Sequence, residues 1–555
     1  MIDDFQHPYL LKRLERLNAI GVALSAERDN SRLLEMILLG AQEITNADGG
    51  TLYTITDDKH LKFEIMSNKT LNISLGGTTD KDIPFLPLPL YLEDGSPNLT
   101  TVAAYATLNN KTVNIANAYE IEDFDFSGTR RFDAKTGYHS QSFLTIPMKN
   151  HESEVIGVLQ LINAIDDDTH EIIPFSVANQ SLVESLASQA AVAMTNHNLI
   201  EGLKSLFEAF IALIADAIDQ KSPYTGGHCR RVPELTMMLT QAAINTQSGP
   251  LKDFNLNENE FYELKVASWL HDCGKVTTPE AVMDKPTKLS SIFDRIQLVD
   301  ERFELLKQQA ECEMLKQQLL LLRNNTENID LQDKFDELAL TLNAFKLKCD
   351  QDRDFLRRAN IGSELMTPED QQRVRDIGML SIIDSEGKLT PFLSENELYN
   401  LSIARGTLTA EERQVINNHI VVTINMLESL PYPKSLLRVP EYACGHHERM
   451  DGKGYPKGLT REQMSIPARV MGIADIFEAL TSKDRPYKKA KTLSESLAIL
   501  GRMKVDHHID PDLFEIFIRE KIYLKYAQQF LEPEQIDEVD HMQIPGYQPR
   551  AGFFM

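Results

Sequence analysis

An uninterrupted heptad pattern between residues 182 and 217 constrains this chain more than any other feature of its sequence. The pattern steps by alternate intervals of four and three residues, and no proline interrupts it. Its positions are Leu182, Leu186, Gln189, Ala193, Asn196, Ile200, Leu203, Phe207, Phe210, Ile214 and Ala217. About five heptads favour a parallel two-stranded coiled coil, so we expect a homodimer through 182–217. The alternative is a single amphipathic helix that packs on its own domain.

Length and charge limit what the rest of the chain can be. At about 100–200 residues per domain, 555 residues predict three or four structural units. Lys and Arg number 57 against 82 Asp and Glu, a formal net charge of −25. This balance argues against nucleic-acid polymers as the main partner, because phosphate contacts need a basic surface. A small anionic ligand would need locally placed cations.

The sequence also predicts a compartment. The five cysteines are odd in number and form no CxxC pair. There is no run of about 18 apolar residues that would span a bilayer, and the N-terminus lacks the apolar stretch of a signal peptide. We therefore expect a reduced, cytoplasmic protein that does not act at a membrane.

The residues before the heptads are typical of an α/β domain. A segment with helical apolar spacing is followed by β-branched, turn-bounded segments, namely 33–47 and then 51–56, 62–66, 142–149 and 155–164. With its SFLTIPM and GVLQLIN strands in this order, the region resembles a GAF sensor domain. We assign it to 20–180, after an N-terminal helix at 1–19 and before a linker helix at 181–220. The resemblance implies either an unknown small ligand or a role in dimerisation.

A helical hairpin interrupts the C-terminal part of the chain. Residues 292–323 and 330–358 are dense in helix formers with helical apolar spacing, and the polar segment NNTEN separates them. We therefore expect a helical insertion at about 292–400. Additional interface and shielding of an active site fit this insertion equally well.

Metal-ligand residue types cluster in five short segments, 224–232, 269–276, 417–422, 444–459 and 472–480. The adjacent pairs His271-Asp272 and His446-His447 can each send side chains to two neighbouring metals, because successive helical residues diverge by about 100°. Imidazoles together with carboxylates suit iron, manganese or zinc better than a magnesium site built from oxygen. A metal pair about 3.5–4 Å apart can clamp the attacking and leaving oxygens of a phosphoryl transfer.

These segments carry a family resemblance. The motif HDxGK at 271–275, together with HHExxDGxGYP at 446–456, resembles the HD-GYP family of cyclic-dinucleotide phosphodiesterases. The match includes YTGGHCRRV, GTLTAEER with the following NNH, and ADIFEALTSKDRPYKKA. It implies an all-α catalytic domain at 221–530, apart from the insertion, and leaves a C-terminal tail at 531–555. The predicted fold class is thus multidomain: an α/β sensor, a long linking helix and an all-α catalytic domain.

The resemblance implies two divalent metal ions, with iron or manganese favoured and zinc, nickel or magnesium as alternatives. The implied metal ligands are His228, His271, Asp272, His419, His446, His447 and Asp475. Tyr224 stands where some members have a glutamate that supports a third metal, so two metals are expected.

Cations near these ligands would bind the substrate. Lys275 follows His271 by four residues, about one helical turn along the same face, and is placed to stabilise charge on the phosphate. The resemblance adds Tyr455, Arg485 and Lys488 to Lys275 as substrate-binding residues, and it gives Asp272 and Lys275 catalytic roles.

The function implied is hydrolysis of cyclic di-GMP to the linear dinucleotide, or onward to GMP, under regulation by the GAF domain. One alternative is a cyclic-dinucleotide receptor with little turnover. Another is a phosphodiesterase for a different cyclic dinucleotide such as cyclic GMP-AMP. Glu478, three residues after Asp475, is a mild departure from the family pattern and leaves room for a different grip on the guanine edge.

Overall fold

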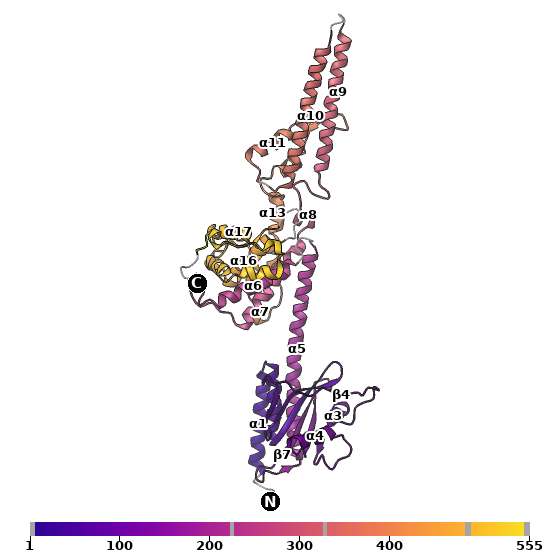
Figure 1. Ribbon diagram of the computed structural model, residues 1–555, viewed down its shortest axis with the longest axis vertical. Coiled ribbons are helices and arrows are strands. Elements are labelled where there is room, and N and C mark those ends of the chain that lie inside the picture. Colours follow the sequence, from indigo (N-terminus) through magenta and orange to yellow (C-terminus); the bar gives the residue numbers. More distant parts are fainter. Residues whose placement is uncertain (1–5, 222–226, 326–329, 364, 483–489, 549–555) are drawn as a thin grey trace. The chain divides into compact units, whose positions relative to one another are not determined.

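The computed structural model describes residues 6–221, 227–325, 330–363, 365–482 and 490–548, with side chains from residue 11 onward. The chain separates into two compact units, Met1–Phe207 and Glu208–Met555. The first is an α/β unit and the second is almost entirely helical (Figure 1). The predicted order of an α/β domain, a long helix and a helical region is confirmed.

One antiparallel sheet organises the first unit. Its main path runs β3-β2-β1-β7-β6-β5, with β4 paired to β2 and β8 to β7. The strands are β1 (Ala47–Ile55), β2 (His60–Asn68), β3 (Ile73–Gly76), β4 (Leu88–Pro89), β5 (Val113–Ile115), β6 (Phe143–Lys149), β7 (Val155–Ile165) and β8 (Ile172–Ile173). The central pair β1 and β7 is long and β-branched, which suits a buried sheet position.

Helices supply the rest of the first unit: α1 (Gln6–Ala26), α2 (Asn30–Thr45), α3 (Val102–Asn109), α4 (Ser127–Thr136) and the beginning of α5 (Val177–Lys221). Helix α1 continues past residue 19 and buries Leu17, Ile20 and Leu24 in one core with α2, α5 and the sheet. Gly50 in β1 allows α2 to pack closely on the sheet, since a Cβ at this position would lie 2.8 Å from the Leu38 side chain of α2.

The heptad segment forms part of one continuous helix of 45 residues, α5. Its first seam residues, such as Leu182 and Leu186, are buried in the core of their own α/β unit. Further along, Ile200, Leu203 and Phe210 are 65%, 69% and 55% exposed. The alternative of a helix that packs on its own domain therefore describes the beginning of the seam. The predicted homodimer would have to use the exposed seam residues that follow.

The helical unit is built around α6 (His228–Ile244) and α16 (Ile466–Thr481), which contact each other extensively. Their apolar faces join α17 (Leu493–Val505), α18 (Pro511–Arg519) and α19 (Ile522–Phe530) in one core. The remaining helices of this part are α7 (Glu258–Leu270), η1 (Cys273–Thr277), α8 (Glu280–Met283), α13 (Ala410–Asn417), α14 (His419–Glu428), η2 (Lys434–Leu436), α15 (Val439–Cys444), η3 (Arg461–Gln463), η4 (Pro533–Gln535) and η5 (His541–Gln543), where η marks a 3-10 helix.

The insertion has a core of its own. It contains α9 (Ile296–Asn324), α10 (Gln332–Ile361), α11 (Pro368–Gly378), β9 (Ser381–Ile383), β10 (Leu389–Pro391) and α12 (Glu395–Leu401). Phe303, Leu356 and Phe392 are among its buried side chains. The predicted hairpin is present as α9 and α10, but the insertion is not purely helical. Strands β9 and β10 pair across a turn in which Gly387 has a φ of 79°.

Among the described helices, none combines the length and apolar character needed to cross a bilayer.

Candidate metal centre

The seven predicted metal ligands converge in the helical unit although they come from distant parts of the sequence. They lie at the start of α6 (His228), between α7 and η1 (His271, Asp272), at the start of α14 (His419), after α15 (His446, His447) and within α16 (Asp475). Their donor atoms form overlapping groups in which every pair lies within 4.8 Å. One group joins His228, His271 and Asp475, and another joins His419, His446 and His447.

Asp272 stands between the two groups. Its Oδ2 lies 3.2 Å from His228 Nε2 and 3.3 Å from His271 Nε2, whereas its Oδ1 lies 3.3 Å from His419 Nε2. Each oxygen of one carboxylate therefore faces a different set of imidazoles. This arrangement matches the bridging role expected of Asp272 between two cations.

Backbone carbonyls orient three of the imidazoles. The Nδ1 atoms of His271, His419 and His446 lie 2.7, 2.6 and 2.6 Å from the carbonyl oxygens of the residues three positions earlier. A ring that donates from Nδ1 leaves Nε2 as a lone-pair donor. All three Nε2 atoms are therefore prepared for a cation.

The donor set fits bound divalent metals. His446 Nε2 is buried and has no hydrogen-bond partner among the described residues. His447 Nε2 lies 3.2 Å from His419 Nε2, close enough for both nitrogens to bind one cation. Such atoms are costly to bury without a partner, and a cation between them would satisfy both. Imidazole with carboxylate suits iron, manganese or zinc.

For His446, His447 and Asp272, the electrostatics favour the protonation state that metals need. Burial lowers the pKa of His446 well below its usual value, and the neighbouring imidazoles lower it further. Burial likewise lowers the pKa of His447 to about 4. For Asp272, burial would raise the pKa, but Lys275 and His271 outweigh it and hold the pKa well below the usual range. These imidazoles are thus neutral and this carboxylate is charged near neutral pH.

Glu478 contacts one of the predicted ligands, His228. It is 1% exposed and lies behind the centre, with Oε2 2.5 Å from His228 Nδ1. Arg231 donates from Nε to Glu478 Oε1 at 2.7 Å. Burial would raise the pKa of Glu478, but His228 and Arg231 lower it. The Glu478 carboxylate therefore orients His228 from behind, and an altered grip on a guanine edge stays a prediction.

Lys275 lies beside the centre, but not on a continuing α-helix. Helix α7 ends at Leu270, and Lys275 belongs to the 3-10 helix η1. Its Nζ donates to Asp272 Oδ2 at 2.5 Å. Burial would lower the pKa of Lys275, but the charges of Asp272 and Asp475 raise it, so the ammonium persists at neutral pH.

Two successive helices lead to His419. The capping box of Thr409 and Glu412 is present and opens α13. Helix α13 ends at Asn417, however, and His419 begins the separate helix α14. A new helix at this point places His419 at an N-terminus, directly against η1.

A glycine-rich loop carries Tyr455 over the centre. The Tyr455 ring stacks on His447, with ring centroids 4.8 Å apart and an interplanar angle of 22°. Buried Glu448 holds the loop by accepting hydrogen bonds from the backbone N–H groups of Lys457 and Leu459. Gly454 is required there, since a Cβ would lie 2.4 Å from the backbone nitrogen of Arg449.

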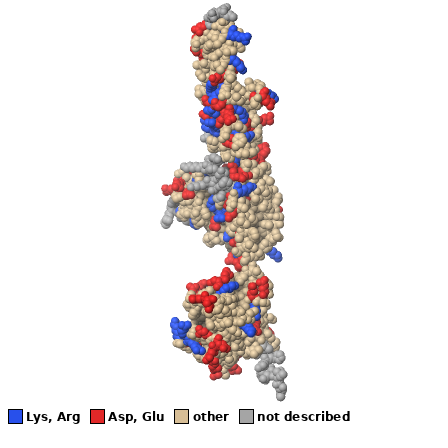
Figure 2. All heavy atoms as spheres, turned by 90° about the vertical axis from the view of Figure 1, so that its right-hand side faces the viewer, with Lys and Arg blue, Asp and Glu red and all other residues tan. Residues whose placement is uncertain are grey.

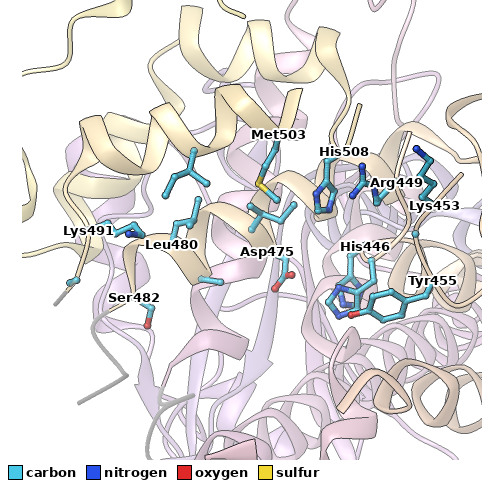
Figure 3. A pocket seen from close by; sticks show the side chains of 16 residues that line it. His446, Arg449, Lys453, Tyr455, Asp475, Leu480, Ser482, Lys491, Met503 and His508 are labelled. Carbon is cyan, nitrogen blue, oxygen red and sulfur yellow. The ribbon is translucent and has the colours of Figure 1, made fainter. Parts of the chain in front are cut away.

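A pocket of about 580 Å³ opens beside these residues (Figure 3). Asp475, His446 and Tyr455 form one end of it, and α16 and α17 supply apolar walls that include Leu480 and Met503. Its other lining residues include Arg449, Lys453, Lys491 and His508. The pocket thus joins the metal ligands to a partly basic, partly apolar cavity.

The predicted substrate residues divide into two sets. Lys275 and Tyr455 lie at the centre, whereas Arg485, Lys488 and the position of Tyr224 fall outside the described residues. Sequence reasoning missed the pocket-lining cations Arg449, Lys453 and Lys491, and it assigned His508 to domain packing. The first two stand within the HHExxDGxGYP motif, so their closeness to His447 was a usable signal.

Comparison with known families agrees with the division into an α/β unit and a helical unit. Residues 29–194 match the GAF domain family and residues 395–513 match the HD domain family. The HD match includes His419, His446, His447 and Asp475, but it begins at α12, the last helix of the insertion, and so excludes His228, His271 and Asp272. The chain therefore carries a GAF domain and an HD domain.

Curated relatives match part of the chain. A cyclic di-GMP phosphodiesterase of Pseudomonas aeruginosa is 32% identical over 149 residues, which are 26% of this chain and 33% of the relative. A 3'3'-cGAMP-specific phosphodiesterase of Vibrio cholerae is 40% identical over 81 residues, 15% of this chain and 19% of the relative. The cyclic di-GMP phosphodiesterase response regulator RpfG of Xanthomonas campestris pv. campestris is 28% identical over 249 residues, 43% and 61% of the two chains. The chain thus spans between a fifth and two fifths of the length of the first curated relatives it matches.

Proposed function

We propose that this chain of a GAF domain and an HD domain is a metal-dependent phosphodiesterase that hydrolyses cyclic di-GMP to the linear dinucleotide, or onward to GMP. The carrying observation is the set of seven convergent ligands, in which buried His446 Nε2 lacks any other partner among the described residues. The adjacent pocket joins that set to cationic and apolar walls, as a phosphodiester of nucleosides requires.

Two divalent ions, when bound, would activate a water as nucleophile and polarise the phosphate. His228, His271, Asp475 and one oxygen of Asp272 would hold one ion, and His419, His446, His447 and the other oxygen of Asp272 would hold the second. We favour iron or manganese, with zinc, nickel or magnesium as alternatives.

The residues of the chain would then orient the phosphate and balance its charge. Water oxygen attacks phosphorus, the bond to the ribose 3'-oxygen breaks, and that oxygen leaves with a proton. Because its ammonium stays protonated, Lys275 serves as a fixed cation for the phosphoryl oxygens and not as a base. Burial raises the pKa of Tyr455 to about 12, so its hydroxyl is a hydrogen-bond donor at neutral pH.

Regulation by the GAF domain is part of the proposal. Helix α5 begins in the core of the α/β unit and continues to Lys221, near the first metal ligand in the sequence. We infer that an unknown small ligand of the GAF domain changes turnover through this helix, and that a homodimer forms through its exposed residues. All five cysteines are free and four are buried, which supports a reducing, cytoplasmic setting.

The test is turnover by metal-loaded protein. Cyclic di-GMP and 3'3'-cGAMP are supplied together and separately with iron, manganese, nickel or zinc, and linear products are separated by chromatography. We expect linear product from cyclic di-GMP and its loss in Asp272→Asn. Preference for the mixed dinucleotide would change the substrate assignment. Binding without turnover under every metal would support the receptor alternative and reject the enzyme.

A further inference from the structure

Helix α9 of the insertion has one face that is already occupied. Phe303 and Leu306 are buried in the insertion core against α10. Ion pairs along the hairpin reinforce this contact, namely Asp300 with Arg357, Glu304 with Arg353, Lys307 with Asp350 and Glu311 with Lys346. Packing and charge therefore account for this side of the helix.

A second apolar stripe follows the opposite face of α9. Its residues follow a seven-residue repeat and are exposed: Leu298 (42%), Leu305 (40%), Leu315 (52%), Leu319 (69%) and Leu322 (57%), with exposed Cys312 in the same register. Glu301 and Gln308 take the two remaining positions near the base. At about 100° per residue, the stripe lies roughly opposite Phe303. Figure 2 shows that the end of the hairpin is mostly uncharged on the face it presents.

We propose that this stripe is a homotypic docking surface, on which a second copy of the chain seats its own α9 in parallel. In heptad terms, Leu298, Leu305, Cys312 and Leu319 take position a, and Leu315 and Leu322 take position d. This is the repeat that supercoils two helices around each other. The proposal does not depend on the catalytic function, and it concerns a surface other than the seam of α5.

The charges beside the stripe favour a second copy of α9 as the partner, and they favour its parallel orientation. Position g carries Glu304 and Glu311, and position e carries Lys316 and Arg323 further along the helix. A parallel second copy sets Glu311 against Lys316 of that copy and Gln318 against its Arg323. An antiparallel copy would set glutamate against glutamate and cation against cation. Glu311 is 48% exposed beside Lys346 and Lys316 is 72% exposed, so both can reach across.

The helix is also prepared for docking. Residues 298–322 span about 37 Å at about 1.5 Å per residue. An isolated helix of this length would lose conformational entropy on forming, but α10 already holds α9 in helical form. A partner therefore adds apolar burial without the cost of folding the surface first.

Cys312 supplies the test. It is exposed, while Cys229, Cys273, Cys349 and Cys444 are buried. In a parallel, in-register pair the two Cys312 thiols face each other, and copper phenanthroline with oxygen would remove two electrons and two protons to join them. We expect a covalent dimer of the full chain on a non-reducing gel at low micromolar protein, and none in Cys312→Ser.

Matched variants distinguish cross-linking that depends on docking through the stripe from cross-linking by random collision of two chains. Leu315→Glu with Leu319→Glu is expected to reduce cross-linking at least tenfold, whereas Leu320→Glu keeps it, because Leu320 is 59% exposed but lies off the stripe. Leu322→Glu is a second stripe variant should the double variant fold poorly, and circular dichroism checks folding. Absent cross-linking in the native chain, or equal cross-linking in stripe and off-stripe variants, would overturn the proposal. A stripe covered by another protein gives the first of these results.

Discussion

Replacing Gly274 with alanine should disrupt the metal centre without replacing any metal ligand. Gly274 lies in η1, where α14 packs directly against it. An alanine Cβ would lie 2.0 Å from the carbonyl oxygen of His419 and 2.6 Å from the backbone nitrogen of Thr423, whereas ordinary contact begins at 3.4 Å. The backbone of α14 must therefore retreat by the difference between 3.4 Å and 2.0 Å, about 1.4 Å.

Two consequences can be scaled from that displacement. Overpacking typically costs about 1–3 kcal/mol, and the obstacles here are backbone atoms that cannot rotate away, so we expect a loss of about 3 kcal/mol in the free energy of unfolding. A shift of about 1 Å in a reacting group can cost about 100-fold in rate. His419 moves with α14, so we expect that loss in kcat/KM and a reduced content of one of the two metals.

The assay combines urea unfolding, elemental analysis and turnover of cyclic di-GMP. Gly202→Ala is the matched control, because a Cβ at Gly202 of α5 would meet nothing within 4 Å. Alanine in a helix interior there should be neutral or stabilising by about 0.5–1 kcal/mol. If Gly274→Ala keeps full metal content and stability within about 0.5 kcal/mol of the native chain, the close packing of η1 on α14 is wrong as described.

Three further changes test the site and the fold. Glu478→Gln removes the charge behind His228 and should weaken metal affinity about 10–100-fold, measured by calorimetric titration; unchanged affinity would deny the orienting role. Tyr455→Phe keeps the ring stack on His447 and loses one hydroxyl, so kcat/KM should fall by about 2–10-fold, whereas a loss beyond about 1,000-fold would require a chemical role for the hydroxyl. Burial would raise the pKa of Asp510, but Arg461 and Arg469 lower it, so its stabilisation is present above the usual carboxyl pKa and lost as pH falls through the lower folded value. Asp510→Asn should therefore cost about 3 kcal/mol at pH 7 and progressively less below about pH 4 in urea unfolding, and an equal cost at both pH values would contradict this.

The sequence predicted those features whose chemistry is restricted to a few residue types. Metal ligands must be residues such as His271 and Asp272, and the family resemblance of the motifs implied all seven residues that the structure brings together. Sequence reasoning missed the contact between Glu478 and His228, because this contact forms only when the fold brings the start of α6 against α16. The pocket cation Lys491 was missed for the same reason, because only the fold shows which lysine after Lys488 lines the pocket.

Heptads illustrate a different limit. A stripe of apolar residues indicates that a helix face will be buried, but it does not say by what. In α5, Leu186 is buried by its own domain while Leu203 on the same seam is exposed. In α9, one stripe is taken by α10, and the leucines of the other are 40% to 69% exposed, with Leu305 at its base also lining a pocket beside β9. Local pattern therefore fixed the helices, and tertiary packing decided which stripes remained available.

The base of the insertion determines whether docking at α9 would change the structure of the rest of the helical unit. Lys288 is buried, and its Nζ donates to the carbonyl oxygens of Leu401 and Ile403, so the segments that leave and re-enter the rest of the helical unit are tied together. A closed base lets a long segment be inserted at little cost to the surrounding fold. The insertion is thus anchored independently of its distal hairpin.

The same base is tied to the helix before His419. Lys285 is buried and binds both oxygens of Glu412 at 2.8 Å, and Glu412 also completes the capping box of α13. This contact holds α13, the helix that precedes α14, in place. Docking at the outer face of α9 should therefore change assembly and leave the metal centre as it is. Leu315→Glu with Leu319→Glu should accordingly abolish cross-linking at Cys312 while kcat/KM stays within about twofold of the native value, since surface changes away from a site rarely exceed about 0.5 kcal/mol. A large fall in kcat/KM would show that the base transmits strain instead of isolating it.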